Sequence, residues 1–199
     1  MTISNTPSIP QYFDSLRSFA VNRNFFSDEE CDKIIKLGYD KIIEPAYLSS
    51  KEQGVIDENI RKARVSFIDE YDESEWLFAK LQTMITQVNS RFFKYHIECF
   101  ESLQFTVYDE PGDHYEFHSD CDGNSYSELQ RKLSFSVQLS HASDYEGGEL
   151  ELYSPNKVIA PQERGSLSVF SSLAYHRVNP IKSGKRLSLV GWVSGNPFS

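Results

Sequence analysis

Two histidines and one aspartate are the residues of this sequence whose types and spacing most clearly suggest chemistry. His118 and Asp120 are separated by a single residue, and His176 follows much later in the chain. Two imidazoles and one carboxylate form the facial ligand set of a non-haem iron and leave further coordination positions open. We therefore expect His118, Asp120 and His176 to bind iron(II) together.

A basic residue follows the second histidine in an alternating segment. Arg186 begins the run Arg186-Leu187-Ser188-Leu189-Val190. Alternate side chains of a β-strand point to the same face, so Arg186 and Ser188 should lie side by side. A guanidinium and a hydroxyl group suit one carboxylate. We expect this pair to bind an anionic co-substrate that chelates the metal.

Residues 104–120 resemble the signature of prolyl 4-hydroxylase-like dioxygenases, which depend on iron(II) and 2-oxoglutarate. The signature residues are present in the same order, at Gln104, Tyr108, Gly112, Tyr115, His118 and Asp120. Residues 145–150 and 176–186 resemble the later Y-x-G-G-E strand and the histidine-to-basic ending of the same family. The resemblance covers roughly residues 100–193, whereas the amino-terminal half is similar only in its general helical character.

The resemblance implies an oxidative reaction. The expected enzyme uses Fe(2+), O2 and 2-oxoglutarate, with ascorbate as a further candidate cofactor, and releases succinate and CO2. Its substrate would be a peptidyl residue of the prolyl type, a free amino acid or another small metabolite. Asp120 favours hydroxylation over halogenation, because related halogenases have a small residue at that position.

The resemblance also implies roles for residues beyond the ligands. Arg186 should bind the distal carboxylate of 2-oxoglutarate, although the prolyl hydroxylase branch often has lysine there. Tyr108 should donate a hydrogen bond to the co-substrate, and Ser188 should assist it. Tyr115 either lines the same pocket or only fills the mouth of the barrel.

Two residues are candidates for substrate binding. Arg131 falls where the resembling hydroxylases place a basic residue beside the substrate groove, and Trp192 falls where they place an aromatic residue. A cation and an aromatic surface suit a peptide or an amino acid. The alternative for each is purely structural: a tryptophan in the core and an arginine in solvent.

A second hypothesis is a non-catalytic jelly-roll module that retains a metal or ligand pocket. The intact ligand set and anion anchor argue against it, because such a module does not need all of them together. The formal net charge of −9 and the pI near 5.0 argue against a nucleic-acid partner, which requires many phosphates to be neutralised. A peptide, a protein or a small molecule is the expected partner, and the oligomeric state is left open.

The expected location is the cytoplasm. The amino terminus has no basic region followed by an apolar run, and the sequence contains no apolar stretch of about 18 residues that would span a membrane. The three cysteines, Cys31, Cys99 and Cys121, fit no paired spacing, which favours a reducing compartment.

The elements that must position these residues divide the chain near residue 99. Helical signals occupy residues 27–38, with a capping box, and about 74–92. Between them, 45–59 is typical of a loop and 63–68 of a strand. Five further strands are expected at 103–108, 132–139, 148–153, 166–170 and 186–193. We expect a mainly β fold with flanking helices (α+β): one domain, 1–199, with helical support over about 1–98 and a catalytic double-stranded β-helix, or jelly-roll, core over about 99–199.

Overall fold

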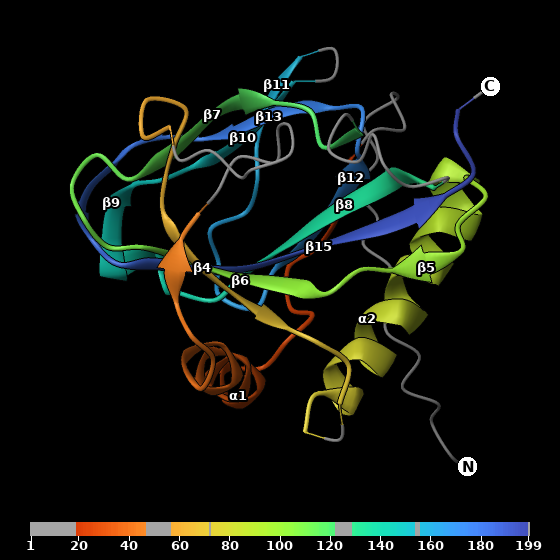
Figure 1. Cartoon of the computed structure of the whole chain (residues 1–199), viewed down its shortest axis with the longest axis horizontal. Coiled ribbons are helices and arrows are strands. Elements are labelled where there is room, and N and C mark those ends of the chain that lie inside the picture. The colour runs from red at the N-terminus through yellow and green to blue at the C-terminus, as the bar shows by residue number, and fades with distance from the viewer. Residues whose placement is uncertain (1–18, 47–56, 72, 122–128, 154–155, 199) are drawn as a thin grey trace.

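The computed structural model describes residues 19–46, 57–71, 73–121, 129–153 and 156–198. Two antiparallel sheets face each other, and the helices cover the outer face of the larger one (Figure 1). The expected jelly-roll fold with flanking helices is therefore confirmed. Within the described residues, no helix is both long and apolar enough to cross a membrane.

The larger sheet has the strand order β1-β12-β8-β15-β6-β4-β2, and β5 pairs with β15 at one end. Its strands are β1 (Phe19–Asn22), β2 (Glu44–Pro45), β4 (Arg64–Ile68), β5 (Cys99–Phe100), β6 (Leu103–Tyr108), β8 (Gln130–Gln138), β12 (Leu167–Ser171) and β15 (Arg186–Gly195). The second sheet, in the order β11-β10-β13-β7-β3, contains β3 (Arg61–Lys62), β7 (His114–His118), β10 (Leu150–Tyr153), β11 (Lys157–Ile159) and β13 (Tyr175–Val178). Strands β9 (Tyr145–Gly147) and β14 (Ile181–Gly184) pair with each other as a separate two-stranded sheet.

The helices begin and end close to the predicted positions. Helix α1 (Asp28–Tyr39) has the expected capping box: the Glu30 amide donates to Ser27 Oγ at 3.2 Å, and the Ser27 amide donates to the Glu30 carboxylate at 2.9 Å. Helix α2 (Glu75–Val88) continues into the π-helical turn Asn89–Phe93, and together they cover the predicted second helix. A short 3₁₀ turn, Ala142–Asp144, precedes β9.

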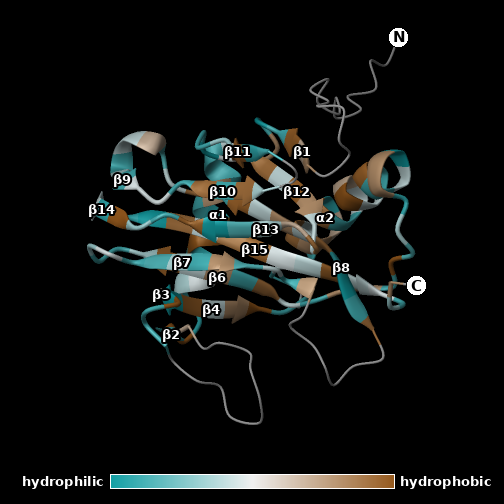
Figure 2. Ribbon diagram, turned by 90° about the horizontal axis from the view of Figure 1, so that it is seen from above, coloured by the Kyte–Doolittle hydropathy of each residue, from teal (hydrophilic) through white to brown (hydrophobic). Residues whose placement is uncertain are grey.

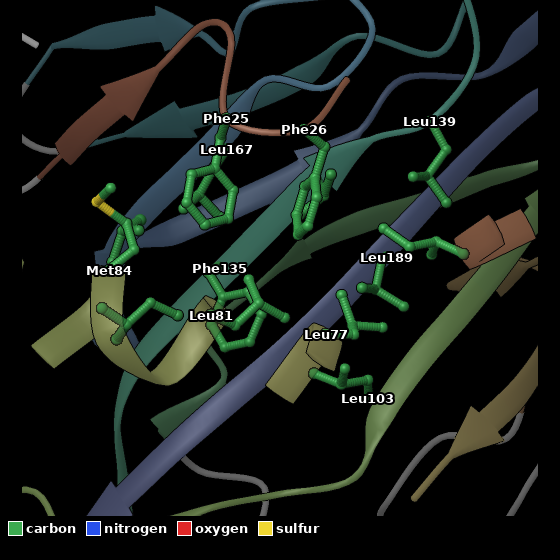
Figure 3. Packing of buried hydrophobic residues seen from close by; sticks show 14 of the residues in the cluster. Phe25, Phe26, Leu77, Leu81, Met84, Leu103, Phe135, Leu139, Leu167 and Leu189 are labelled. Atoms are coloured by element: carbon green, nitrogen blue, oxygen red, sulfur yellow. The ribbon is translucent and has the colours of Figure 1, made fainter. Parts of the chain in front are cut away.

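Alternation along the strands of the larger sheet separates two kinds of side chain. Leu103, Phe105 and Val107 of β6 belong to the apolar cluster shared with the helices, whereas Gln104 and Thr106 turn to the space between the sheets. Apolar and polar segments accordingly alternate along the strands in Figure 2. Figure 3 shows the helix side of this arrangement, where residues of α2 pack on β6, β8, β12 and β15. The inner face is thus free to carry polar chemistry.

The predicted strands are largely confirmed, with shifted ends. The prediction for 103–108 matches β6, and β8, β12 and β15 each overlap their predicted ranges. The prediction for 148–153 overlaps β10, but β9 ends at Gly147, and Gly148 and Glu149 separate the two strands. Both glycines have positive φ, +81° and +65°, a conformation that costs glycine little.

Several strands were not predicted, and some of them lie before residue 99. β1, β7, β11, β13 and β14 are short, and most carry polar residues that hide a simple alternation. In the amino-terminal half, β1 to β4 join the two sheets of the core. This half therefore supplies strands as well as helices, because the edges of both sheets need partners for their backbone groups. Most of the predicted loop 45–59, namely 47–56, lies outside the described residues.

Candidate metal centre and its pocket

The two histidines lie opposite each other on neighbouring strands. His118 ends β7, His176 lies on β13, and the two are register partners. Asp120 follows β7 directly, and one ligand atom from each of the three residues lies within 4.8 Å of the others. His118 Nε2 is 3.5 Å from Asp120 Oδ1, and His176 Nε2 is 3.4 Å from Asp120 Oδ2. The structure thus brings together the three residues that the sequence singled out.

Backbone carbonyls fix the orientation of both imidazoles. His118 Nδ1 donates to the Glu116 carbonyl at 2.8 Å, and His176 Nδ1 donates to the Ala174 carbonyl at 3.0 Å. Because Nδ1 makes this hydrogen bond, Nε2 is the atom of each imidazole that faces the Asp120 carboxylate and is available to a metal. Such hydrogen bonds set the tautomer of metal-binding histidines.

The charges of the site also suit a cation. Burial alone would raise the pKa of Asp120, but His176, His118 and a hydrogen bond from Ser134 outweigh it and hold the pKa below its usual range. Burial lowers the pKa of His176, although the Asp120 charge opposes this. A charged carboxylate and a neutral imidazole are the forms that bind a divalent metal. The donor set therefore fits iron(II).

Aromatic rings support the two imidazoles. The Tyr115 ring stacks on His118 with a centroid separation of 3.6 Å, and Phe170 meets His176 edge-on at 4.9 Å. Both aromatic residues line the cavity in front of the metal ligands. Tyr115 lies in the wall of this cavity, and a role of Tyr115 in binding the co-substrate stays a prediction.

Every residue that the sequence suggested for the site lines one cavity of about 190 Å³. A single water needs only about 10–15 Å³ of such space, so this cavity can hold a small molecule. The predicted residues in its wall are Tyr108, Tyr115, His118, Asp120, Arg131, His176, Arg186, Ser188 and Trp192. The wall also contains Arg61, Phe67, Gln104, Ser136, Leu150, Phe170, Val178 and Val190, which the sequence did not suggest.

Arg186 is a buried cation without a counter-ion. Its side chain is almost fully buried, its Nη1 has no hydrogen-bond partner, and no acidic residue of the described chain forms an ion pair with it. Its guanidinium lies 5.5 Å from the centroid of the Tyr108 ring, and Ser188 is the next inward residue of β15. Burial raises the pKa of Tyr108, which keeps the phenol protonated and able to donate. A buried, unpaired guanidinium is costly, so this wall is suited to an anion.

Arg131 and Trp192 form a pair in another part of the wall. The Arg131 guanidinium lies 3.9 Å from the centroid of the Trp192 ring. Glu101 holds this arginine through hydrogen bonds of 3.0 and 2.7 Å, and Ser194 donates to the same carboxylate at 2.7 Å. Trp192 is buried, and its Nε1 has no partner. Arg131 is therefore not simply solvated, but a role for the pair in substrate binding stays a prediction.

Some residues of the site had no signal in the sequence. Arg61 is one of three basic residues in the run Arg61-Lys62-Ala63-Arg64, and only the change of sheet between β3 and β4 turns it inward. Ser134 donates to Asp120 Oδ2 at 2.7 Å, but Ser136 of the same strand looks the same in sequence. Alternation along β8 indicates the inward face without indicating which serine meets the carboxylate.

Comparison with known proteins agrees with this geometry. Residues 103–194 match the family model of the 2OG-Fe(II) oxygenase superfamily. A PKHD-type hydroxylase of Crocosphaera subtropica is 36% identical over 102 residues, which cover 49% of this chain and 45% of the relative. A PKHD-type hydroxylase of Synechococcus sp. is 44% identical over 87 residues, 42% of this chain and 37% of the relative. The matched part thus spans less than half the length of these relatives.

Solved structures show the same fold over most of the chain. A prolyl-4-hydroxylase of Pseudomonas putida superposes with a TM-score of 0.69 at 20% identity and covers 90% of this chain and 94% of its own. A prolyl hydroxylase of Trichoplax adhaerens, in complex with a hypoxia inducible factor peptide fragment, gives 0.72 at 20% identity, with 89% and 83% covered. The fold is that of these prolyl hydroxylases, and residues 103–194, which match the model of the 2OG-Fe(II) oxygenase superfamily, contain His118, Asp120, His176 and Arg186.

Proposed function

We propose that this protein is an iron(II)- and 2-oxoglutarate-dependent dioxygenase. Its substrate is a prolyl-type residue of a peptide, or a free amino acid or similar small metabolite, which becomes hydroxylated. The observation that carries the proposal is the position of a buried, unpaired Arg186 in the same cavity as the convergent His118, Asp120 and His176. A metal ligand set and an anion anchor in one cavity suit a co-substrate that chelates the metal and carries a second carboxylate.

Each group of the site has a distinct part in this proposal. His118, Asp120 and His176 hold the iron. Iron and 2-oxoglutarate, when bound, supply the reaction in which O2 is consumed, succinate and CO2 are released and the substrate gains a hydroxyl group. The hydrogen bonds from the histidines to the Glu116 and Ala174 carbonyls keep the Nε2 atoms directed at the metal.

The co-substrate is held by residues of β6 and β15. Arg186 binds the distal carboxylate, and this ion pair offsets the cost of burying the guanidinium. Tyr108 and Ser188, which share the cavity wall with Arg186, donate hydrogen bonds to the same molecule. The apolar residues Leu150, Phe170 and Val178 line the cavity and exclude water from the reacting groups.

The substrate is expected at the wall formed by Arg131 and Trp192. Glu101 fixes the guanidinium over the indole ring, so the pair offers a rigid flat surface with an indole N–H free to donate. Such a surface suits the ring of a prolyl-type residue or the backbone of a peptide. Ascorbate as a further cofactor, a cytoplasmic location and the absence of a nucleic-acid partner stay predictions from the sequence.

The alternative, a non-catalytic jelly-roll module, is less consistent with the electrostatics. A buried cation without a partner lowers stability, and folding alone gives no reason to place it beside a metal ligand set. A degenerate module would be expected to lose one of these groups.

Two measurements on the intact chain test the proposed function. Anaerobic calorimetry with Mn²⁺ should show that 2-oxoglutarate binds only after the metal, and aerobic incubation with iron(II) should release succinate slowly even without substrate. The matched control is succinate itself, which lacks the 2-oxo group and should bind far more weakly. Metal-loaded protein that binds neither 2-oxoglutarate nor any analogue would contradict the proposal, whatever the aerobic assay shows.

A further inference from the structure

A second buried arginine in the cavity has no counter-ion. Arg61 of β3 is 8% exposed, its Nε has no hydrogen-bond partner, and no acidic residue of the described chain forms an ion pair with it. The other buried side-chain atoms without partners in the described chain are Arg186 Nη1 and Trp192 Nε1. All three residues line the same cavity, and all three atoms are donors. The cavity is therefore built for ligands that supply acceptors at more than one position.

The basic residues next to Arg61 have acidic partners, and they face away from the cavity. Lys62 Nζ is 3.1 Å from Glu110 and 3.4 Å from Asp113, and Arg64 donates to Asp109 at 2.7 Å. Both neighbours point away from the cavity and pair with acids. Only the side chain that faces the cavity lacks one, so the missing anion is expected to come from the cavity itself.

The charges of the proposed ligands do not supply this anion. The charge of iron(II) and that of Arg186 are balanced by Asp120 together with the two carboxylates of 2-oxoglutarate. The positive charge of Arg61 remains without compensation. In a buried site an uncompensated charge is costly, so a further negative group should enter with the substrate.

The position of Arg61 differs from that of Arg186. Arg61 comes from the second sheet, where it is the register partner of Tyr115, and its guanidinium lies 4.5 Å from the centroid of the Tyr115 ring. The same ring stacks on His118. Arg186 comes from the larger sheet and lies over Tyr108. The two guanidiniums thus enter the cavity from different sheets, with Arg61 on the side of the metal ligand His118.

We propose that Arg61 binds a carboxylate of the primary substrate, an inference that rests on the proposed function. The carboxylate is either that of a free amino acid or that of an acidic side chain beside the target residue of a peptide. The two sources share one chemistry, a bidentate pair between a guanidinium and a carboxylate. Arg61 therefore determines specificity: it selects an acidic substrate over its neutral counterpart.

The test uses full-length protein loaded with Mn²⁺ and 2-oxoglutarate without oxygen, so that Arg186 is already occupied. Calorimetry then measures the binding of the free L-amino acids, including L-proline, and of their carboxamides. A second pair of probes is a capped prolyl-glutamate dipeptide and its glutamine counterpart. The variant is Arg61→Gln, and Arg64→Gln is the matched control because it removes the same charge from an outward-facing position of the adjoining strand.

In wild-type protein and Arg64→Gln, the best acidic probe should bind at least about tenfold more tightly than its amide, and Arg61→Gln should remove this difference. A preference confined to the amino acids identifies a metabolite, and one confined to the dipeptides identifies a peptide. Arg61→Lys keeps the charge and should keep part of the preference, which separates the loss of a site from a folding defect.

Three results would overturn the proposal. In the first, the neutral probes bind as tightly as the acidic ones. In the second, no acidic probe binds the protein loaded with Mn²⁺ and 2-oxoglutarate. In the third, Arg61→Gln raises the dissociation constant of 2-oxoglutarate and leaves the preference for acidic probes intact, which assigns Arg61 to the co-substrate. Failure of the first loading step with Mn²⁺ and 2-oxoglutarate is a different outcome, because it contradicts the proposed function itself.

Discussion

Ser134 donates a hydrogen bond to the carboxylate that lies between the two imidazoles, with 2.7 Å between Ser134 Oγ and Asp120 Oδ2. Ser134 Oγ is also 2.9 Å from Ser172 Oγ, and the Asp120 amide donates to the Ser172 carbonyl at 3.1 Å. Asp120 is thus fixed from its backbone and from its side chain. The carboxylate of this site is oriented by two serines of the larger sheet and its β12–β13 connection.

Ser134→Ala should therefore weaken metal binding without unfolding the protein. Loss of a hydrogen bond to a metal-binding carboxylate typically lowers metal affinity about 10- to 100-fold. Ser136→Ala is the matched control, because Ser136 lines the same cavity but makes no hydrogen bond to Asp120. Competition titrations with Mn²⁺ measure both variants. Equal affinities for the two would mean that Ser134 does not position the ligand.

Asp120→Ala should abolish metal-dependent succinate release and leave the fold nearly intact. Asp120 lies just after β7, beside the cavity, and adds little to the apolar core. Its removal also relieves the burial of a charge in the metal-free protein. Circular dichroism and metal analysis after dialysis check the two parts of this prediction. If the variant is unfolded, Asp120 is needed for the stability of the fold. Full turnover by the variant would exclude Asp120 as a metal ligand.

Arg186→Ala should raise the KM for 2-oxoglutarate far more than the KM for the primary substrate. The reason is that only the co-substrate carboxylate is expected to pair with this guanidinium, a pair worth about 2–4 kcal/mol when buried. Arg23→Ala is a suitable control, because Arg23 is exposed and forms an ion pair with Glu163 at the surface. Steady-state kinetics with each compound varied in turn provide the measurement. An unchanged KM for 2-oxoglutarate would mean that another residue binds its distal carboxylate.

Much of the fold and of the site could be predicted because strand alternation is strong in the larger sheet. In β6 and β15 the residues facing the helices are apolar, so the positions of Tyr108, Arg186 and Ser188 on the inner face follow from the pattern. The second sheet lacks this contrast. Its inner face holds the polar residues His118 and His176, and its outer face is exposed, so β7 and β13 show no apolar period.

The residues that could not be predicted depend on long-range register. Arg61 enters the cavity because β3 pairs with β7 before the chain crosses to the larger sheet at Ala63. Nothing near Arg61 in the sequence distinguishes it from Lys62 or Arg64, which pair with acids at the surface. The partnership of Ser134 with Asp120 likewise depends on how β8 lies against the segment after β7. Local patterns can indicate a face, but only the assembled sheets decide which residues meet across it.

Glu151 is predicted to stabilise the second sheet in a pH-dependent way. It is buried on β10, and Arg177 and Asn179 donate to it at 2.9 Å, while Lys157 also pairs with it. Burial alone would raise the pKa of Glu151, but these three partners outweigh burial and lower the pKa from its usual 4.5 to about 2. Because the pKa is lower in the folded state, the contribution is complete above about pH 4.5 and is lost as the pH falls toward 2.

Glu151→Gln should accordingly lower the free energy of unfolding at pH 7 by about 2 kcal/mol, an estimate reduced for the solvent exposure of Lys157 and Arg177. The difference from wild type should shrink as the pH falls from 4.5 toward 2, because Glu151 of the unfolded wild-type chain binds a proton in this range while the folded carboxylate stays charged. Glu146→Gln is the control, since Glu146 forms an exposed pair with Lys182. Urea unfolding at several pH values measures all three proteins. A difference between Glu151→Gln and wild type that stays constant down to pH 2 would show that the shape of the side chain, and not its charge, holds β10 and β13 together.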